Sequence, residues 1–269
     1  MILAHVLGVS RALVIAHPER ILDEAEAQCA QDLLARRASG EPVAYLLGKR
    51  EFYGRDFVVS PATLIPRPET ELLVEQALAR LSGHFKSGSH AIASVCEIAA
   101  VNRAGVLDLG TGSGAIAISL SLEHAKARVV AADISRSALE IATENARRLD
   151  AHVEFIESNW YTNLIGCKFD LIVANPPYVA GNDGHLSQGD LRFEPHIALT
   201  DESDDGLRSI HTIVDGASAH LHPGGWLLFE HGYDQADACR TLLLKAGFAN
   251  LISVNDLAGI ARVAGGQIG

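Results

Sequence analysis

Apolar residues recur at two different spacings along the chain, and the spacing changes before its midpoint. Residues 2–48 carry the three-to-four-residue periodicity of helices, with breaks at Pro18 and at Gly40–Pro42, which predicts a small helical unit. The stretch REFYGRDFVVS then has two short β-rich runs around Gly54–Arg55, a pattern typical of a hairpin. A further helix is expected to begin near Pro68, because the fixed φ of proline suits the first helical position.

From Gly105 onward, short apolar runs alternate with amphipathic stretches. The strand-like runs are GVLDLG, ARVVAADI, HVEFIES, FDLIVANPP and GGWLLFEHG, and two shorter runs close the chain. Such alternation predicts an α/β fold with a mainly parallel, doubly wound sheet. We therefore expect three parts: a helical domain at 1–48, a segment with hairpin, helix and linker at 49–104, and the doubly wound domain at 105–269.

Composition narrows the class of protein. The 269 residues are 48% hydrophobic and 20% charged, which indicates a globular chain, and the net charge is -11. An acidic balance argues against sequence-blind binding to nucleic acid or to anionic membranes, which require clustered Lys and Arg. The four cysteines form no CxxC pair, so we expect no metal site and a reducing, cytoplasmic location. No apolar run reaches the roughly 18 residues of a membrane span, and we expect a monomer.

A glycine-rich loop follows the first strand of the doubly wound domain. The sequence VLDLGTGSGAIAI places five small residues between a strand and a helix, namely Gly110, Thr111, Gly112, Ser113 and Gly114. Glycines there allow a tight turn and let backbone N–H groups approach a ligand at a helix N-terminus. Asp133 ends the next strand, where a carboxylate can accept both hydroxyls of a ribose. The loop predicts a cofactor that contains a nucleoside, and a nicotinamide dinucleotide and S-adenosylmethionine both remain possible at this point.

The fourth strand of this domain ends in an unusual corner. In LIVANPPYVA, four apolar residues are followed by Asn175, Pro176, Pro177 and Tyr178. Prolines cannot donate to a sheet ladder, so the strand ends there. In a doubly wound sheet the first and fourth strands are commonly neighbours across the switch in strand order, which places this corner beside the glycine loop.

The residue types of this corner suit a planar –NH2 group. The lone pair of an amide nitrogen is delocalised, and two acceptors that hold both N–H bonds out of plane would free it. The side-chain oxygen of Asn175 and the carbonyl of Pro176 can be those acceptors, while Tyr178 offers a flat face. Positioning toward a sulfonium methyl is then most of the catalysis. A hydride-transfer enzyme has no use for this corner, so S-adenosylmethionine is the favoured cofactor.

Together with DLGTGSG, Asp133 and NPPY, the segments GEPVAYLLGKREFYG, LIPRPETELLVE, RFEP and FEHG make the chain resemble the release factor glutamine methyltransferase family. The resemblance covers about 85% of the chain. It implies a Rossmann-like methyltransferase domain that uses S-adenosylmethionine. It also implies methylation of the glutamine amide in the Gly-Gly-Gln motif of class-1 peptide release factors, with a helical N-terminal domain gripping that substrate.

The resemblance also assigns roles to individual residues. Gly110–Gly114 would line the methionine and ribose end of the cofactor, and Asp133 would accept from the ribose hydroxyls. Asn159 and Trp160 would flank the adenine. Asn175–Tyr178 would hold the glutamine, with Asn175 also next to the cofactor.

Several features depart from the family pattern or have a second interpretation. The family usually has Asp at the position of Asn159, and the chain starts inside the family's usual first helices, which implies a shortened helical domain. Arg67–Thr70 resemble a segment at the active-site mouth, and helix capping explains Pro68 and Thr70 equally well. For Glu230 and His231, substrate contact and packing are equal alternatives. The tripeptide Gly265–Gln267 repeats the target motif, and chance in a glycine-rich tail is the better explanation.

Three rival functions share part of this pattern. A ribosomal-protein glutamine methylase would share the NPPY corner, but LIPRPETE favours the release factor type. An amino-methylase of nucleic acid is expected to carry a basic recognition segment, which the net charge of -11 does not suggest. A non-catalytic partner that binds S-adenosylmethionine would not need an intact NPPY.

Overall fold

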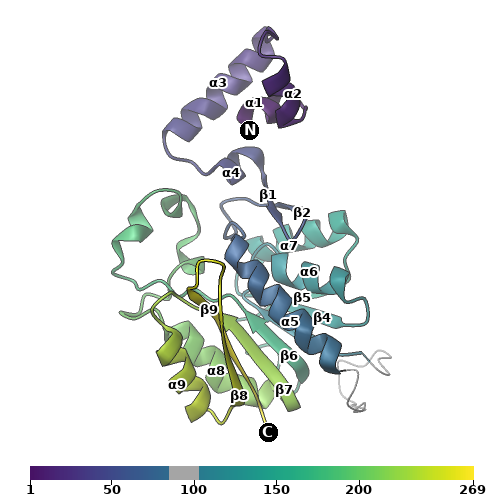
Figure 1. The fold of residues 1–269 in the computed structure, drawn as a ribbon, viewed down its shortest axis with the longest axis vertical. Coiled ribbons are helices and arrows are strands. Elements are labelled where there is room, and N and C mark those ends of the chain that lie inside the picture. The colour runs from purple at the N-terminus through teal and green to yellow at the C-terminus, as the bar shows by residue number, and fades with distance from the viewer. Residues whose placement is uncertain (85–102) are drawn as a thin grey trace.

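The computed structural model describes residues 1–84 and 103–269, and it confirms the predicted α/β class. Figure 1 shows a group of helices at the N-terminus that stands beyond the edge of a large sheet with helices packed on both of its faces. The predicted linker at 83–104 falls mostly on residues 85–102, which lie outside the described residues. Within the described part, no helix is both long and apolar enough to cross a bilayer.

The predicted helical unit contains four short-to-medium helices, which are α1 (Ile2–Val6), α2 (Arg11–Ala16), α3 (Glu24–Ala38) and α4 (Val43–Leu47). A capping box starts α3: the side chain of Asp23 accepts from the Glu26 N–H at 2.8 Å, and the Glu26 carboxylate accepts from the Asp23 N–H at 3.1 Å. At its far end, α4 stops at Gly48, whose φ of 67° lies in the left-handed region.

The predicted hairpin and the helix after it are both present. Strands β1 (Lys49–Phe52) and β2 (Arg55–Val58) pair antiparallel. A short 3-10 turn (Pro68–Thr70) leads into α5 (Glu71–His84), so the proline does sit at the start of a helical segment. The buried residues of α5 recur at helical spacing and face the same core as Phe52 and Phe57 of the hairpin; they are Leu73, Val74, Ala77 and Leu81.

The large sheet has seven strands in the order β5-β4-β3-β6-β7-β9-β8. The five that run parallel are β3 (Gly105–Leu109), β4 (Arg128–Asp133), β5 (Val153–Glu157), β6 (Phe169–Ala174) and β7 (Leu221–Glu230). The helices between and after them are α6 (Ala115–Glu123), α7 (Arg136–Leu149), α8 (Arg208–His220) and α9 (Ala236–Lys245). Three 3-10 turns follow β6, at Gly184–Ser187, Leu191–Phe193 and His196–Ala198.

Successive residues of the central strands point to opposite faces, and both faces are covered by helices. Val106 of β3 packs in the cluster that contains the buried faces of α5 and α6, while Leu107 packs in the cluster that contains those of α8 and α9. Leu171 and Ile172 of β6 divide between the two clusters in the same way. This double burial explains why the strands read as continuous apolar runs and not as alternating ones.

The two runs that close the chain form β8 (Ala249–Asn255) and β9 (Ala261–Gln267), with β9 inserted between β7 and β8. The Gly-Gly-Gln tripeptide lies within β9. A Cβ at Gly265 would collide with the Leu227 carbonyl of β7, and Gln267 donates from Nε2 to the Gly224 carbonyl at 2.8 Å. Close strand packing therefore accounts for these glycines.

Candidate active site

Neighbouring parallel strands end at one edge of the sheet, and most of the polar residues singled out from the sequence lie at these ends. The glycine loop follows β3, Asp133 ends β4, and Asn175 follows β6. The prediction that β3 and β6 are neighbours is confirmed by their pairing from Val106 with Leu171 onward. Because β3 lies between β4 and β6, the loop lies between Asp133 and Asn175, at the switch in strand order where ligands bind in such sheets.

The glycine loop takes a backbone path that side chains would obstruct. Gly110, Gly112 and Gly114 have φ values of 73°, 56° and 82°, all in the left-handed region that favours glycine. A Cβ at Gly114 would lie 2.8 Å from the Ile118 side chain, so the third glycine allows α6 to start tightly. A Cβ at Gly112 would meet nothing within 4 Å, which leaves that side of the loop open to a ligand.

Asp133 fastens the loop to the next strand. Its Oδ2 accepts from the Gly112 N–H and its Oδ1 accepts from the Ser135 N–H, each at 2.8 Å. The carboxyl is 9% exposed, and burial raises its pKa above the ordinary value. Each oxygen has a second lone pair, so the group can still accept from a ligand.

Asp108 is a further acidic residue at this place that sequence reasoning missed. It is fully buried under the loop, and its Oδ2 accepts from the Thr111 hydroxyl at 2.7 Å and from the Ala117 N–H at 3.2 Å. Its Oδ1 is buried without a hydrogen-bond partner in the described part of the chain. Burial raises the pKa of this carboxyl to about 7. An acidic residue inside the apolar run GVLDL was the signal that could have found it.

The expected adenine-flanking pair follows β5. Trp160 lies against the glycine loop, since a Cβ on Gly110 would be 3.6 Å from its ring. Its backbone has a φ of 48°, and its carbonyl accepts from the buried Ser158 hydroxyl at 2.8 Å. Asn159 is exposed, and its carbonyl accepts from the Thr162 N–H and hydroxyl. The structure thus brings Trp160 to the loop and leaves the Asn159 side chain at the surface beside it.

The Asn-Pro-Pro-Tyr corner is held by contacts from three other segments. Asn175 donates from Nδ2 to the Thr70 Oγ1 at 3.1 Å, and Tyr178 donates from its hydroxyl to Glu230 Oε1 at 2.9 Å. The Tyr178 carbonyl accepts from the Gln235 side chain at 3.0 Å. No hydrogen bond from residues 1–84 or 103–269 reaches the Pro176 carbonyl oxygen.

Thr70 and Glu230 have polar roles that the sequence did not decide. Thr70 donates from Oγ1 to Glu230 Oε2 at 2.6 Å, and its side chain does not cap the turn at Pro68–Thr70. Pro68 occupies the first position of that turn, as the capping interpretation predicts, while the Thr70 hydroxyl contacts a residue from a distant strand. Glu230 is 1% exposed, and burial raises its pKa. Of the two alternatives for Glu230, the structure shows a buried residue that bonds the corner.

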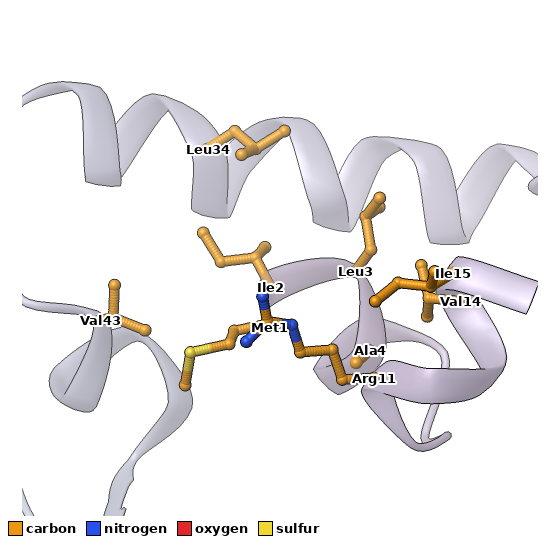
Figure 2. A pocket seen from close by; sticks show the side chains of 9 residues that line it. All are labelled: Met1, Ile2, Leu3, Ala4, Arg11, Val14, Ile15, Leu34 and Val43. Atoms are coloured by element: carbon orange, nitrogen blue, oxygen red, sulfur yellow. The ribbon is translucent and has the colours of Figure 1, made fainter. Parts of the chain in front are cut away.

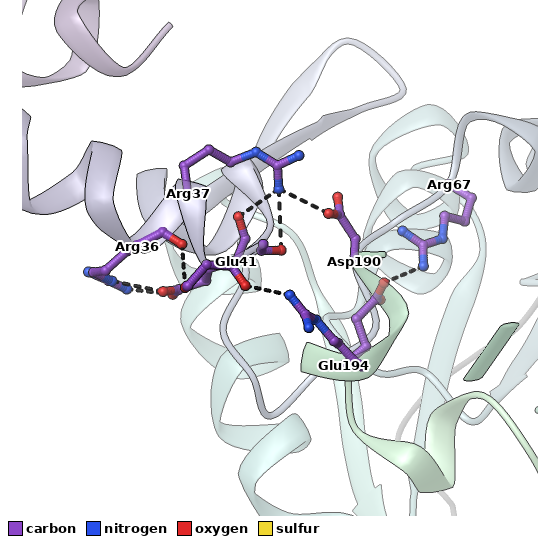
Figure 3. Close-up of polar contacts among 9 residues, drawn as sticks. Arg36, Arg37, Glu41, Arg67, Asp190 and Glu194 are labelled. Atoms are coloured by element: carbon purple, nitrogen blue, oxygen red, sulfur yellow. Dashed lines mark hydrogen bonds and ion pairs between the residues drawn. The ribbon is translucent and has the colours of Figure 1, made fainter. Parts of the chain in front are cut away.

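Beyond the corner, the chain runs through the 3-10 turns and reaches the N-terminal helices. Glu194 is buried and pairs with Arg67, and it also accepts from the Ile65 N–H at 2.9 Å. Farther out, Arg37 in the last turn of α3 donates to Asp190 at 3.0 Å (Figure 3). Arg192 donates to the Ser39 carbonyl in the same place. These contacts connect the helical unit to the segment that follows Asn175–Tyr178.

The helical unit itself has an apolar pocket of about 410 Å³. Figure 2 shows Ile2 and Leu3 of α1 facing Leu34 of α3 across it, with Val43 at one side and Arg11 at the other. It is lined by the N-terminal helices and lies apart from the sheet edge described above. Among the described residues, no group of three or more His, Cys, Asp or Glu side chains could hold a metal ion.

Comparison with known proteins gives consistent matches. Residues 1–48 match the model of the PrmC N-terminal domain, and residues 81–190 match that of the methyltransferase small domain. The chain is 51% identical to a release factor glutamine methyltransferase of Burkholderia pseudomallei, over 100% of this chain and 90% of the relative. It is 49% identical to that of Bordetella pertussis, over 100% of this chain and 93% of the relative.

Solved structures of methyltransferases share the fold. A methyltransferase from Pyrococcus furiosus superposes with a TM-score of 0.55 at 16% identity, covering 89% of this chain and 99% of the other. The 16S rRNA N2 G1207 methyltransferase of T. thermophilus, solved in complex with AdoMet and guanosine, has a TM-score of 0.57 at 19% identity. That match covers 82% of this chain and 50% of the other. At these identities the likeness is one of fold alone.

Proposed function

The chain belongs to the release factor glutamine methyltransferase family, and we propose that it methylates the side-chain amide nitrogen of the glutamine in the Gly-Gly-Gln motif of class-1 release factors. The observation that carries the proposal is the corner at Asn175–Tyr178, which lies beside the glycine loop on the neighbouring strand. An amide receptor next to a cofactor loop is what such a transfer requires.

S-adenosylmethionine is the proposed methyl donor, and the residues at the sheet edge fit it. The open side of Gly112 and the ring of Trp160 against Gly110 leave a cradle that side chains on the loop would fill. The unpartnered Oδ1 of Asp108 is a buried acceptor under the same loop, and Asp133 is proposed to accept from the ribose. When bound, the cofactor supplies an electrophilic methyl group on a sulfonium centre.

The residues of the corner bind and orient the acceptor amide. The Oδ1 of Asn175 and the carbonyl of Pro176 accept its two N–H bonds and hold the nitrogen lone pair free. The two prolines keep that carbonyl in place without adding N–H groups that need partners. Tyr178 supplies a ring face and is itself fixed at both its hydroxyl and its carbonyl. The nitrogen becomes acidic once methylated, so no strong base is needed to remove its proton.

We also propose a division of labour along the chain. Residues 1–48 grip the release factor, 49–104 connect, and 105–269 hold the cofactor and the reacting amide. The match of residues 1–48 to a separate domain model and the apolar pocket in the helical unit support this division. An apolar surface of this kind suits contact with a protein substrate.

The decisive experiment offers the purified protein four acceptors in parallel, with labelled S-adenosylmethionine. The acceptors are a class-1 release factor, the same factor with its motif glutamine replaced by glutamate, ribosomal protein and nucleic acid. We expect label on the unmodified factor alone, mapped to the Gly-Gly-Gln peptide. Label on the glutamate variant, or on nucleic acid and not on the factor, would contradict the proposal.

A further inference from the structure

Three segments that are far apart in sequence meet in one buried polar chain behind Asn175. Thr70 comes from the turn before α5, Glu230 from the end of β7, and Asn175 from the end of β6. Thr70 and Glu230 are 4% and 1% exposed, so water cannot substitute for the contacts between them. The chain of hydrogen bonds runs from Asn175 Nδ2 to Thr70 Oγ1 at 3.1 Å and from Thr70 Oγ1 to Glu230 Oε2 at 2.6 Å.

We propose that Thr70 and Glu230 are positioning residues that fix which way the Asn175 amide faces. The proposal rests on the proposed function, because it matters only if the Asn175 oxygen accepts from an –NH2 group. Neither residue touches the reacting amide in this scheme; both act through Asn175.

The hydroxyl of Thr70 carries a single proton, and this decides which way the Asn175 amide faces. Glu230 Oε2 accepts from the Thr70 hydroxyl, so the single hydroxyl proton of Thr70 is committed to Glu230. Thr70 can then only accept from its other neighbour. The donor of Asn175 is its Nδ2, so Nδ2 faces Thr70 and Oδ1 faces away. A flipped amide would bring Oδ1 against Thr70 Oγ1 with no proton between them, which leaves a buried acceptor unsatisfied.

The second oxygen of Glu230 is held in the same way. Tyr178 donates to Oε1 at 2.9 Å, and burial raises the pKa of its hydroxyl, so it stays a donor. Each carboxyl oxygen of Glu230 therefore accepts one hydrogen bond, Oε2 from Thr70 and Oε1 from Tyr178. Burial raises the pKa of the Glu230 carboxyl, and the hydrogen bonds from Thr70 and Tyr178 act in the opposite direction. One buried carboxylate thus orients Asn175 and Tyr178 together.

The test is a double-mutant cycle with a conservative rescue. Thr70→Val, Thr70→Ser and Asn175→Ala are made singly, and Thr70→Val is also combined with Asn175→Ala. Thr63→Val, at a threonine that is also buried but lies outside this chain of bonds, is the matched control. Single-turnover methylation of a release factor and affinity for S-adenosylmethionine are measured for each variant.

We expect Thr70→Val to slow methylation at least about tenfold, with cofactor affinity unchanged. Thr70→Ser should recover a rate near that of the wild type, and Thr63→Val should keep it. In the Asn175→Ala background, Thr70→Val should cost no further rate, because its effect passes through the missing amide. An undiminished rate in Thr70→Val, or the same loss in both backgrounds, would overturn the inference.

A readout that needs no substrate separates this inference from the proposed function. The side-chain amide protons of Asn175 are identified in NMR spectra by their absence from Asn175→Ala. In the wild type and in Thr70→Ser, one of these two amide protons should show the chemical shift and the slow exchange of a hydrogen-bonded donor. In Thr70→Val, the same proton should lose that chemical shift and exchange rapidly. The same spectrum for wild type and Thr70→Val would refute the relay even if a release factor is methylated. A wild type inactive on release factors with the expected spectra would refute only the proposed function.

Discussion

The buried carboxylates at the sheet edge and the Glu41 carboxylate of the helical unit respond to their surroundings in opposite ways. Asp108, Asp133 and Glu230 are buried and accept from neutral donors, and burial raises the pKa of each. Glu41, near the end of α3, is paired with Arg36, and that hydrogen bond lowers its pKa. Asp190 pairs with Arg37 on the surface (Figure 3).

This difference separates two uses of a charged group. A buried carboxylate with a raised pKa makes folding less favourable at neutral pH, and such groups cluster at functional sites. A surface ion pair contributes roughly 0–1 kcal/mol and is screened by salt. The edge is therefore built for fixed geometry, while the ion pair between Arg37 and Asp190 adds little to the contact between the helical unit and the segment of 3-10 turns.

The largest expected effect tests the buried side of this contrast. In the wild type, Asp108 should make the free energy of unfolding fall by up to about 4 kcal/mol between about pH 4 and pH 7. Asp108→Asn should abolish this fall. In the wild type the unfolded chain loses the proton of Asp108 near 3.8, while the folded chain keeps it to about 7. Stability from this group is thus full at low pH and lost as the pH rises. The neutral amide has no such titration and can still accept from Thr111.

Urea unfolding at a series of pH values measures this effect, as the difference between variant and wild type. Groups that do not interact with Asp108 titrate in both proteins and cancel in that difference, whereas the repulsion by which Asp133 raises the pKa of Asp108 is part of the effect measured. Asp56→Asn, at an exposed carboxylate of the hairpin, is the matched control. Equal pH slopes for wild type and Asp108→Asn would show that the buried carboxyl is ordinary, and the contrast would break.

The next effect concerns the reacting centre. Asn175→Ala should lower turnover by at least about a hundredfold, the scale seen when one preorganised polar group is lost from such a centre. Cofactor affinity should persist, since its proposed contacts are on the glycine loop and Asp133. Asn175→Asp still offers an acceptor oxygen and should keep some activity. Single-turnover rates and calorimetry distinguish these outcomes, and near-normal methylation by Asn175→Ala would remove the proposed receptor role.

A somewhat smaller loss is expected at the ribose end. Asp133→Ala should weaken binding of S-adenosylmethionine by about 1.5–3 kcal/mol, the usual worth of a hydrogen bond to a charged group. It also removes the acceptor that holds the Gly112 N–H. Calorimetry checks the affinity, with Asp133→Asn as the variant that keeps an acceptor oxygen and loses the charge. Unchanged affinity in Asp133→Ala would place the ribose partner elsewhere.

The smallest effect tests the exposed side. Arg37→Ala and Asp190→Ala should each lower the free energy of unfolding by under about 1 kcal/mol, and less at high salt. The double variant should show a coupling of the same small size. Chemical unfolding at low and high salt measures all three. A coupling above about 2 kcal/mol would mean that the helical unit and the segment of 3-10 turns after β6 are held as firmly as the sheet edge.

The sequence was informative where one residue type has one physical use. The glycine turn after β3, the prolines that end β6, and the alternation of strands and helices were all placed correctly. What could not be read was which polar groups would meet across the fold. Thr70 and Glu230 are 160 positions apart in the sequence, and no local pattern links them. The insertion of β9 between β7 and β8 was missed for the same reason, since pairing between distant strands leaves no local trace.

Strand β9 bears on how the proposed activity distinguishes the tripeptide of this protein from that of its substrate. Its own Gly-Gly-Gln, the proposed target motif, lies in the sheet with the glutamine amide engaged at both ends: Nε2 donates to Gly224, and Oε1 accepts from Asn250. Gln267 pairs with Trp226, toward the end of β7 away from Glu230. The tripeptide is therefore held by strand pairing here, and under the proposed function a substrate must offer its glutamine amide free of such bonds. Under the proposed function, the tripeptide alone is therefore an insufficient signal for a substrate, because the copy in this protein is held within a sheet.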